Sequence, residues 1–273
     1  MHMAKWVGRS ILVLALAAAA VPAAAQTTDF VPEVGQPGKD VVWVPSPPET
    51  VEKMMEVGRV TPQDFVIDLG SGDGRNVIAA AKRGARGLGV EYNNDMVELS
   101  KRIASKEGVG ERAQFVQGDM FQADFSKATV LALFLLPSNL LQLRDKILDL
   151  QPGTRIVLNT FGIQDWTPDE QVTLENCTSW CTVMLNIVPA KVAGTWKLPQ
   201  GELTLTQQYQ MVSGTMKYGD GRTVPLNGRL RKTEITLTGE NQELKGRVNG
   251  KTLEGSARSS NGQPTQITGT KVS

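Results

Sequence analysis

The chain has 273 residues, of which 40% are hydrophobic, and a formal net charge of +1 from 29 basic and 28 acidic side chains. This length and composition predict a globular protein of one or two domains, and the near-zero charge gives no reason to expect nucleic acid as a partner. The only histidine is His2, near the N-terminus. A Ser-His-Asp or Cys-His mechanism is therefore excluded for the rest of the chain, and no metal site is expected.

The first 25 residues have the three zones of a secretory signal peptide. Lys5 and Arg9 precede an apolar stretch at residues 11–21, and small residues ending at Ala25 follow it. That stretch is far shorter than the roughly 20 residues a membrane-spanning helix needs, so a membrane anchor is the less favoured alternative. We expect cleavage after Ala25, export to the periplasm, and no stable membrane span after cleavage.

After an irregular lead-in at residues 26–45, short apolar runs alternate with amphipathic ones. The apolar runs predict buried parallel strands at residues 65–69, 87–91, 114–117, 129–134 and 155–158. Helices are expected from Pro48 to Gly58 and over residues 76–82, 96–105 and 140–148. This alternation predicts an α/β domain with a Rossmann-like, doubly wound and mostly parallel sheet covered on both faces.

The alternation of strand-like and helix-like patterns stops after about residue 170. Residues 172–174 and 182–188 are expected to form an antiparallel terminal hairpin around Cys177 and Cys181. In an oxidising compartment these cysteines could pair across a short loop, whereas a continuous strand would hold them too far apart. A local disulfide and two buried free thiols both stay open at this point.

From residue 192 to the end, short alternating runs are broken by glycines and helical periodicity is absent. This spacing predicts a small all-β domain, either an antiparallel meander or a closed barrel, with a thin core because apolar residues are sparse. The expected strands lie at residues 202–206, 214–218, 234–238, 246–248, 252–255 and 266–269. The expected domains are therefore a signal peptide (1–25), a ligand-binding α/β domain (26–189) and a β-domain (190–273).

A glycine-rich loop joins the first expected strand to the helix that follows it, and its sequence is Asp68-Leu69-Gly70-Ser71-Gly72-Asp73-Gly74. Glycines at this place let the backbone approach a ligand closely, at the carboxyl ends of parallel strands. Alone, the pattern is compatible with a simple turn or with a dinucleotide site. It lacks, however, the third glycine position of the dinucleotide fingerprint.

Two acids follow the neighbouring strands, Glu91 at the end of the second and Asp119 after the third. One carboxylate can accept hydrogen bonds from both ribose hydroxyls, and the other from an adenine amine. Asp68 and Asp73 add negative potential, which suits a sulfonium and repels a pyrophosphate. Each acid taken singly could be a solvated loop carboxylate, but together they favour S-adenosylmethionine.

The stretch from Val44 to about Trp166 resembles the class I, seven-strand methyltransferases, and within them the lysine methyltransferases similar to the ATP-synthase c-subunit enzyme. The resemblance is carried by Val44-Pro45-Ser46-Pro47, Asp68 to Arg75, Gly118-Asp119, Leu135-Leu136-Pro137 and Pro152-Gly153-Thr154-Arg155. It implies that Glu91 binds ribose, that Asp119 and Met120 bind adenine, and that residues 44–46 help cover the methionyl end. The expected cofactor-binding residues are Asp68, Gly70, Ser71, Gly72, Asp73, Gly74, Glu91, Tyr92, Asp119 and Met120.

The methyl acceptor is less well defined by the sequence. Apolar surroundings lower the pKa of a lysine amine, and we expect them from Trp43, Pro45, Phe134, Leu135 and Pro137. Residues 134–136 could equally be the buried end of a strand. No side chain stands out as a catalytic base, and positioning can supply most of the acceleration.

Three functions stay open on this basis. The chain could methylate protein lysine, or it could methylate a small molecule in a pocket shaped by the β-domain. The third possibility is a non-catalytic exported protein that binds a ligand and retains the fold. The leader and the added β-domain are the two departures from the family pattern.

Overall fold

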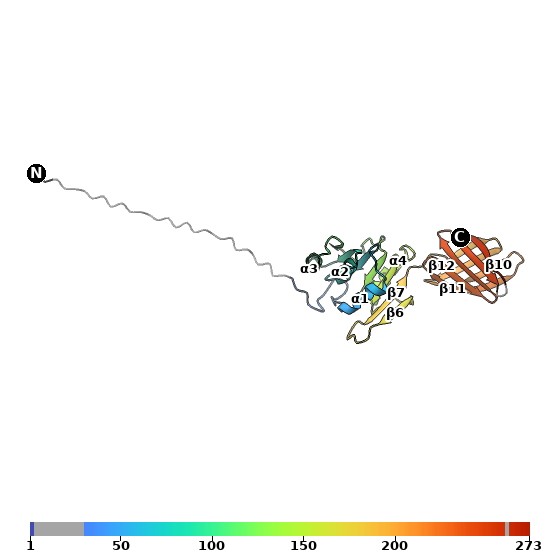
Figure 1. Cartoon of the computed structure of the whole chain (residues 1–273), viewed down its shortest axis with the longest axis horizontal. Helices are drawn as coiled ribbons and strands as arrows, with labels where there is room; N and C mark the ends of the chain where they lie inside the picture. Colours follow the sequence, from blue (N-terminus) through green and yellow to red (C-terminus); the bar gives the residue numbers. More distant parts are fainter. Residues whose placement is uncertain (3–29, 260–261) are drawn as a thin grey trace. The chain divides into compact units, whose positions relative to one another are not determined.

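The computed structural model describes residues 1–2, 30–259 and 262–273, so the expected signal peptide lies outside the described residues apart from its first two. The chain divides into two compact units, Met1–Val31 and Pro32–Ser273, and the helices and strands that the structure describes belong to the second (Figure 1). None of the helices in the described part is both long and apolar enough to cross a membrane.

The first half of the second unit contains a mixed sheet, seven-stranded within the described residues, in the order β3-β2-β1-β4-β5-β7-β6. The first five strands are parallel, and β6 and β7 pair antiparallel at one edge. This confirms the Rossmann-like expectation and its terminal hairpin. The strands are β1 (Phe65–Leu69), β2 (Arg86–Glu91), β3 (Ala113–Gln117), β4 (Val130–Leu133), β5 (Arg155–Asn159), β6 (Glu170–Thr173) and β7 (Thr182–Ile187).

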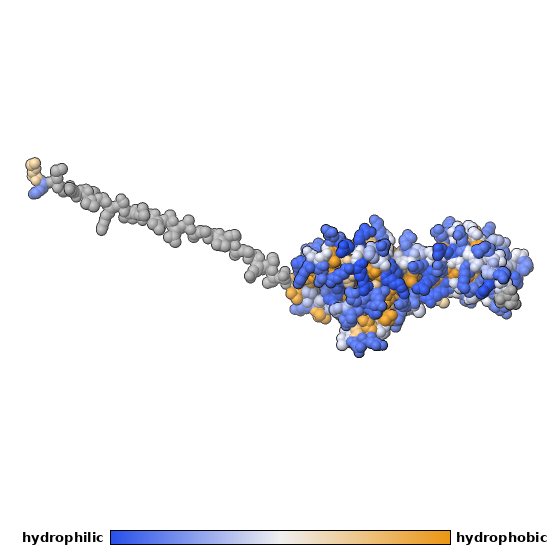
Figure 2. Space-filling view, viewed as in Figure 1, coloured by the Kyte–Doolittle hydropathy of each residue, from blue (hydrophilic) through white to orange (hydrophobic). Residues whose placement is uncertain are grey.

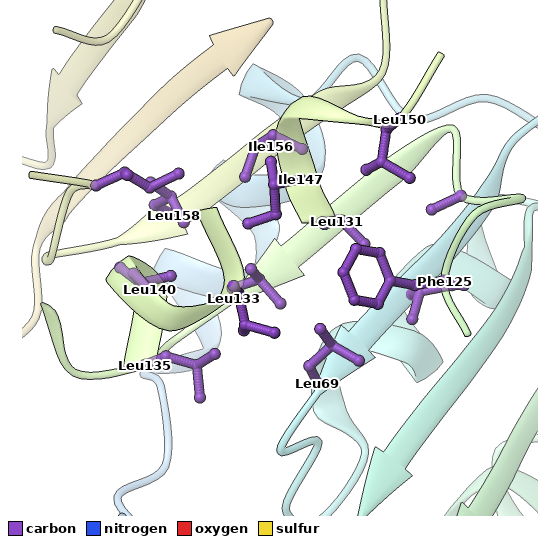
Figure 3. Close-up of a cluster of buried hydrophobic side chains, with 14 of the residues drawn as sticks. Leu69, Phe125, Leu131, Leu133, Leu135, Leu140, Ile147, Leu150, Ile156 and Leu158 are labelled. Carbon is purple, nitrogen blue, oxygen red and sulfur yellow. The ribbon is translucent and has the colours of Figure 1, made fainter. Parts of the chain in front are cut away.

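Helices cover both faces of this sheet, because successive strand side chains point to opposite sides. On β1, Ile67 and Leu69 join the cluster that contains α4, whereas Val66 joins the cluster that contains α1 and α2. Figure 3 shows the first cluster, in which leucine and isoleucine side chains of α4 and the central strands meet. The helices are α1 (Pro48–Val57), α2 (Arg75–Lys82), α3 (Asn94–Lys106) and α4 (Pro137–Leu148).

Two helices begin earlier than their apolar periodicity indicates. The side chain of Asn93 accepts a hydrogen bond from the Asp95 backbone N–H at 2.9 Å and so caps α3 before Met96. Helix α4 begins at Pro137, whose fixed φ suits the first helical position, three residues before the first apolar residue, Leu140. Polar residues at helix starts are invisible to hydrophobic periodicity.

Strand β6 begins two residues earlier than the expected 172–174 and stops at Thr173. Asp169 anchors it, since its backbone N–H bonds to the carbonyl of Leu185 and its carboxylate accepts from the N–H of Ile187 at 2.8 Å. The loop between β6 and β7 is closed by a disulfide between Cys177 and Cys181. The cysteines therefore lie in a hairpin loop rather than within a strand.

The second half forms a closed antiparallel barrel, eight-stranded within the described residues, so the open alternative between meander and barrel is decided for the barrel. Each strand contributes one or two large apolar side chains to the interior, and Trp196 is fully buried there. Two strands, β8 and β11, have no counterpart among the expected ones, and β11 escapes notice because it carries Pro225, Gly228 and many polar residues. The strands are β8 (Gly194–Leu198), β9 (Gly201–Gln208), β10 (Met211–Tyr218), β11 (Thr223–Arg231), β12 (Glu234–Gly239), β13 (Gln242–Asn249), β14 (Thr252–Ser259) and β15 (Thr265–Lys271).

Candidate functional site

The glycine-rich loop leaves β1 at the centre of the sheet, where β1 lies between β2 and β4. Gly70, Gly72 and Gly74 have φ angles of 74°, 55° and 80°, in the left-handed region that residues with a Cβ rarely adopt. The backbone N–H groups of Gly70 and Ser71 both donate to the carbonyl of Val90, at 2.8 and 3.1 Å. The loop is therefore bound to the end of β2 and turns sharply above the sheet.

Glu91 is fixed against this loop. Its carboxylate accepts hydrogen bonds from the backbone N–H groups of Gly72 and Asn93, both at 2.9 Å. The carbonyl of Gly72 in turn accepts from the hydroxyl of Ser100 at 2.9 Å. Backbone donors thus hold one carboxylate in place where β1 and β2 end.

A cavity opens beside Glu91. Its wall is made by the ends of β1, β2 and β3 and by the segment 36–44, which we call the strap. The structure brings seven of the fifteen expected residues together here: Trp43, Gly70, Glu91, Tyr92, Asp119, Met120 and Phe134.

A smaller hollow adjoins this cavity and shares Trp43, Val44, Gly70 and Phe134 with it. The expected residues Pro45, Asp68, Ser71, Gly72 and Asp73 line it, together with Asn76. A Cβ on Gly72 would lie 2.6 Å from the indole nitrogen of Trp43, so the absence of a side chain lets the indole lie directly over the loop. A side chain at position 72 would therefore displace Trp43 first.

Three of the expected residues line neither space. A Cβ on Gly74 would meet the ring of Phe115 at 2.5 Å, so this glycine permits close packing of α2 rather than ligand contact. Leu135 is 1% exposed and belongs to the core, and Pro137 is exposed at the start of α4. The alternative of a buried strand end therefore describes Leu135 better than a substrate wall.

The strap carries a residue that the sequence did not single out. The Lys39 ammonium lies 3.2 Å from the Asp119 carboxylate and within 6 Å of the ring centres of Tyr92 and Phe121. A backbone hydrogen bond from Phe121 and the bond from Lys39 lower the pKa of Asp119. No pattern in the Pro- and Gly-rich lead-in could have located Lys39, because only folding brings the strap across the cavity.

Asp68 has the opposite electrostatic environment. It is 3% exposed and accepts a hydrogen bond from the side-chain amide of Asn76 at 3.0 Å. Burial raises its pKa well above the ordinary range, and the negative charges of Glu91 and Asp73 add to the shift. Asp73 is paired with Arg75, whose Nε lies 2.9 Å from it, so Asp73 contributes less free negative potential than its position in the loop suggests.

Comparison with known proteins identifies relatives of the sheet-containing half. The profile of the ANTKMT methyltransferase domain matches residues 68–170. A protein-lysine N-methyltransferase of Saccharolobus islandicus is 38% identical over 151 residues, which cover 54% of this chain and 94% of that protein. The human lysine N-methyltransferase of the ATP-synthase c-subunit is 35% identical over 128 residues, which cover 46% of this chain and 54% of that protein.

A solved methyltransferase structure also matches about half of this chain. The chain resembles a crystal structure described as an RNA methyltransferase from Salinibacter ruber in complex with S-adenosyl-L-homocysteine, with 42% sequence identity and a TM-score of 0.52. The match covers 55% of this chain and 96% of that one. The matched domain profile ends at residue 170, before the barrel begins.

The residues around the two spaces fit S-adenosylmethionine. Glu91 and Asp119 offer carboxylate acceptors in the larger cavity, where a ribose and an adenine amine need them. In the smaller hollow, the Oδ1 atom of Asn76 is buried and has no hydrogen-bond partner among the described residues. Beside Asp68, this acceptor suits a methionyl ammonium, because buried acceptors are costly when they stay unpaired.

Proposed function

We propose that this chain, which belongs to the S-adenosylmethionine-dependent methyltransferase family of the Saccharolobus enzyme, methylates lysine side chains of protein. The observation that carries the proposal is the two-part space beside the glycine-rich loop, with carboxylates fixed at its wall. Relatives named as lysine methyltransferases support lysine as the acceptor.

The residues of the chain bind the cofactor and orient it toward the acceptor. S-adenosylmethionine supplies the activated methyl group when it is bound. Glu91 would accept hydrogen bonds from the ribose hydroxyls, and Asp119 with Met120 would hold the adenine. Asp68 and Asn76 would bind the methionyl ammonium. A reaction with an activated donor needs alignment more than a dedicated base.

The acceptor amine must be neutral when it attacks. Trp43 and Phe134 line both spaces and present apolar surface to the place where they meet. Exclusion of water there disfavours the ammonium and lowers the pKa of the lysine amine. The proton is released before transfer, and the chain needs only to keep the amine in this dry environment.

The test is a methyl-transfer assay with radiolabelled S-adenosylmethionine and three separate acceptors: poly-L-lysine, total RNA and a small-molecule extract. We expect label in poly-L-lysine, recovered as methyllysine after acid hydrolysis. The near-zero net charge gives no support for a polyanionic acceptor, so RNA should stay unlabelled. Label in RNA or in the extract alone would contradict the lysine assignment, and no binding of the donor by calorimetry would contradict enzyme function altogether.

We further propose that the chain is exported to the periplasm. The arrangement of charged, apolar and small residues before Gln26 supports this proposal, as does a disulfide, which persists in oxidising compartments. Fractionation of the producing cell and N-terminal sequencing test it. We expect a mature chain beginning at Gln26 in the periplasmic fraction, and an intact cytosolic chain would refute the proposal.

A further inference from the structure

Three aromatic rings meet beside the wall of the cofactor space. The ring centre of Trp180 lies 5.3 Å from that of Phe134 and 5.9 Å from that of Phe161, and the two phenylalanine centres are 6.1 Å apart. We call these residues the aromatic cluster. They come from three distant segments: Phe134 directly follows β4, Phe161 lies two residues after β5, and Trp180 lies in the loop between β6 and β7. Because Phe134 lines both cofactor spaces, the cluster continues outward from their common wall.

The cluster is not an ordinary piece of the core. All three rings are only partly buried, whereas the neighbouring leucines of β4 are fully buried. Figure 2 shows apolar surface gathered over the β6–β7 hairpin, and the barrel face in view is largely hydrophilic. Apolar surface that stays partly exposed beside a ligand space marks a candidate interaction site.

The backbone is strained at the two points that place these rings. Thr160, directly before Phe161, has a φ of 61°, and Trp180 itself has a φ of 57°. Left-handed φ values are unfavourable outside glycine and gather at functional sites. The N–H of Thr160 is held by the carbonyl of Thr182 at 2.7 Å, which ties the strained turn to β7.

The loop that carries Trp180 is held from two sides. The disulfide between Cys177 and Cys181 closes a five-residue ring in which Trp180 is the fourth member. The carbonyl of Trp180 accepts a hydrogen bond at 3.0 Å from the hydroxyl of Thr50, a fully buried residue of α1. Helix α1 packs beside β7, so this bond joins the loop to the rigid part of the domain (Figure 1).

We propose that Trp180 is a specificity-determining residue that, with Phe134 and Phe161, binds the alkyl chain of the acceptor lysine and the methylated ammonium that the transfer leaves. Aromatic faces attract alkylammonium ions, with methylated ones included, and their apolar surface accommodates the four-carbon stem. The disulfide keeps the indole in its orientation, so acceptor binding responds to the oxidation state of the loop. This inference rests on the proposed lysine acceptor and adds the site that selects it.

The first test measures kinetics with poly-L-lysine as the acceptor. Trp180→Ala should raise KM for poly-L-lysine about fivefold or more, with little change in kcat and with the affinity for S-adenosylmethionine unchanged within about twofold. Trp180→Phe should restore most of the loss. Ser179→Ala, an exposed change in the same loop, is the matched control and should behave as the unaltered chain does. An unchanged KM in Trp180→Ala would overturn the proposal.

A second measurement does not depend on turnover and therefore separates this proposal from the proposed function. The indole ¹⁵N–H resonance of Trp180, assigned by its absence in Trp180→Phe, is followed during titration with Nε-trimethyllysine amide or norleucine amide. We expect saturable shifts with the cation and several-fold weaker binding of the neutral analogue. Equal responses to both amides would overturn the proposal even if poly-L-lysine is methylated, and a selective response would support it even if poly-L-lysine is not.

The restraints on the loop give the third test. Thr50→Val removes the hydrogen bond to Trp180 and keeps the shape of the residue, and Cys177→Ser with Cys181→Ser opens the ring. Both variants retain the tryptophan, so each should raise KM less than Trp180→Ala does, and reduction with a dithiol should reproduce the cysteine variant. If neither variant alters KM, the disulfide does not position Trp180.

Discussion

The two ends of the central sheet differ in how fully their buried aspartates are hydrogen-bonded within the protein. At the amino-terminal ends of β1, β4 and β5, Asp64 accepts hydrogen bonds from Thr61, Thr129 and Arg155. At the carboxyl ends, Asp68 receives a single side-chain bond, from Asn76. The two acids lie at the opposite ends of one strand, β1, so the contrast between them is local.

The pKa values of the two acids differ accordingly. Burial alone would raise the pKa of Asp64, but the bonds from Thr129 and Thr61 and the charge of Arg155 outweigh it and lower the pKa. For Asp68, burial dominates and the pKa rises. At the amino-terminal end of the sheet, hydrogen bonds from the protein itself satisfy the carboxylate of Asp64, which therefore serves stability. At the carboxyl end, hydrogen-bond acceptors stay free to bind a cationic ligand.

The largest expected effect is the loss of Asp64. Asp64→Ala removes the carboxylate that pairs with the partly buried Arg155 and should lower the free energy of unfolding by about 3 kcal/mol, measured by urea denaturation. Asp145→Ala, which changes an exposed acid that pairs with its sequence neighbour Arg144, is the control and should cost little. An equal loss of stability in Asp68→Ala would remove the contrast between the two ends.

Glu91 gives the next largest effect, on binding rather than on folding. Glu91→Ala should weaken S-adenosylmethionine binding by about 1.5–3 kcal/mol through lost charge-assisted hydrogen bonds, measured by calorimetry. Glu98→Ala removes an exposed acid of α3 and is the matched control. Unaltered affinity in Glu91→Ala would show that the ribose is held elsewhere.

The pH dependence distinguishes the two acids next. Because the folded chain holds the Asp68 proton more tightly than the unfolded chain does, the stability that this residue contributes is lost as pH rises above the ordinary aspartate pKa of about 4 towards the raised value. Over the same rise, its growing negative charge should tighten cofactor binding. Asp68→Asn should abolish both trends in urea denaturation and calorimetry across about pH 5–8, and parallel curves for the two proteins would contradict the raised pKa.

The smallest effect concerns the strap. If Lys39 must leave Asp119 before the adenine amine can bind there, Lys39→Met should tighten cofactor binding by less than about fivefold. Lys127→Met, at an exposed site away from the cavity, serves as the control. Weaker binding in Lys39→Met would instead assign Lys39 a direct contact with the cofactor.

The sequence alone determined the order of strands and helices in the sheet-containing half, the glycine-rich loop and the acids at the ends of β2 and β3. Local signals carry this information: apolar runs stop at glycines, and carboxylates follow the strands directly. Leu135 and Pro137, which were expected on the substrate side, line neither space. A run of apolar residues does not indicate which of its side chains points into the protein core.

Only the tertiary structure decided what crosses the site and what surrounds the acceptor. Lys39 reaches Asp119 from a distant part of the chain, and Trp180 reaches Phe134 because the terminal hairpin folds back beside β5 and α1. Closure of the barrel likewise depends on the pairing of β8 with β15, the first and last barrel strands in the sequence. Such contacts follow from long-range packing, which has no periodic signature in the sequence.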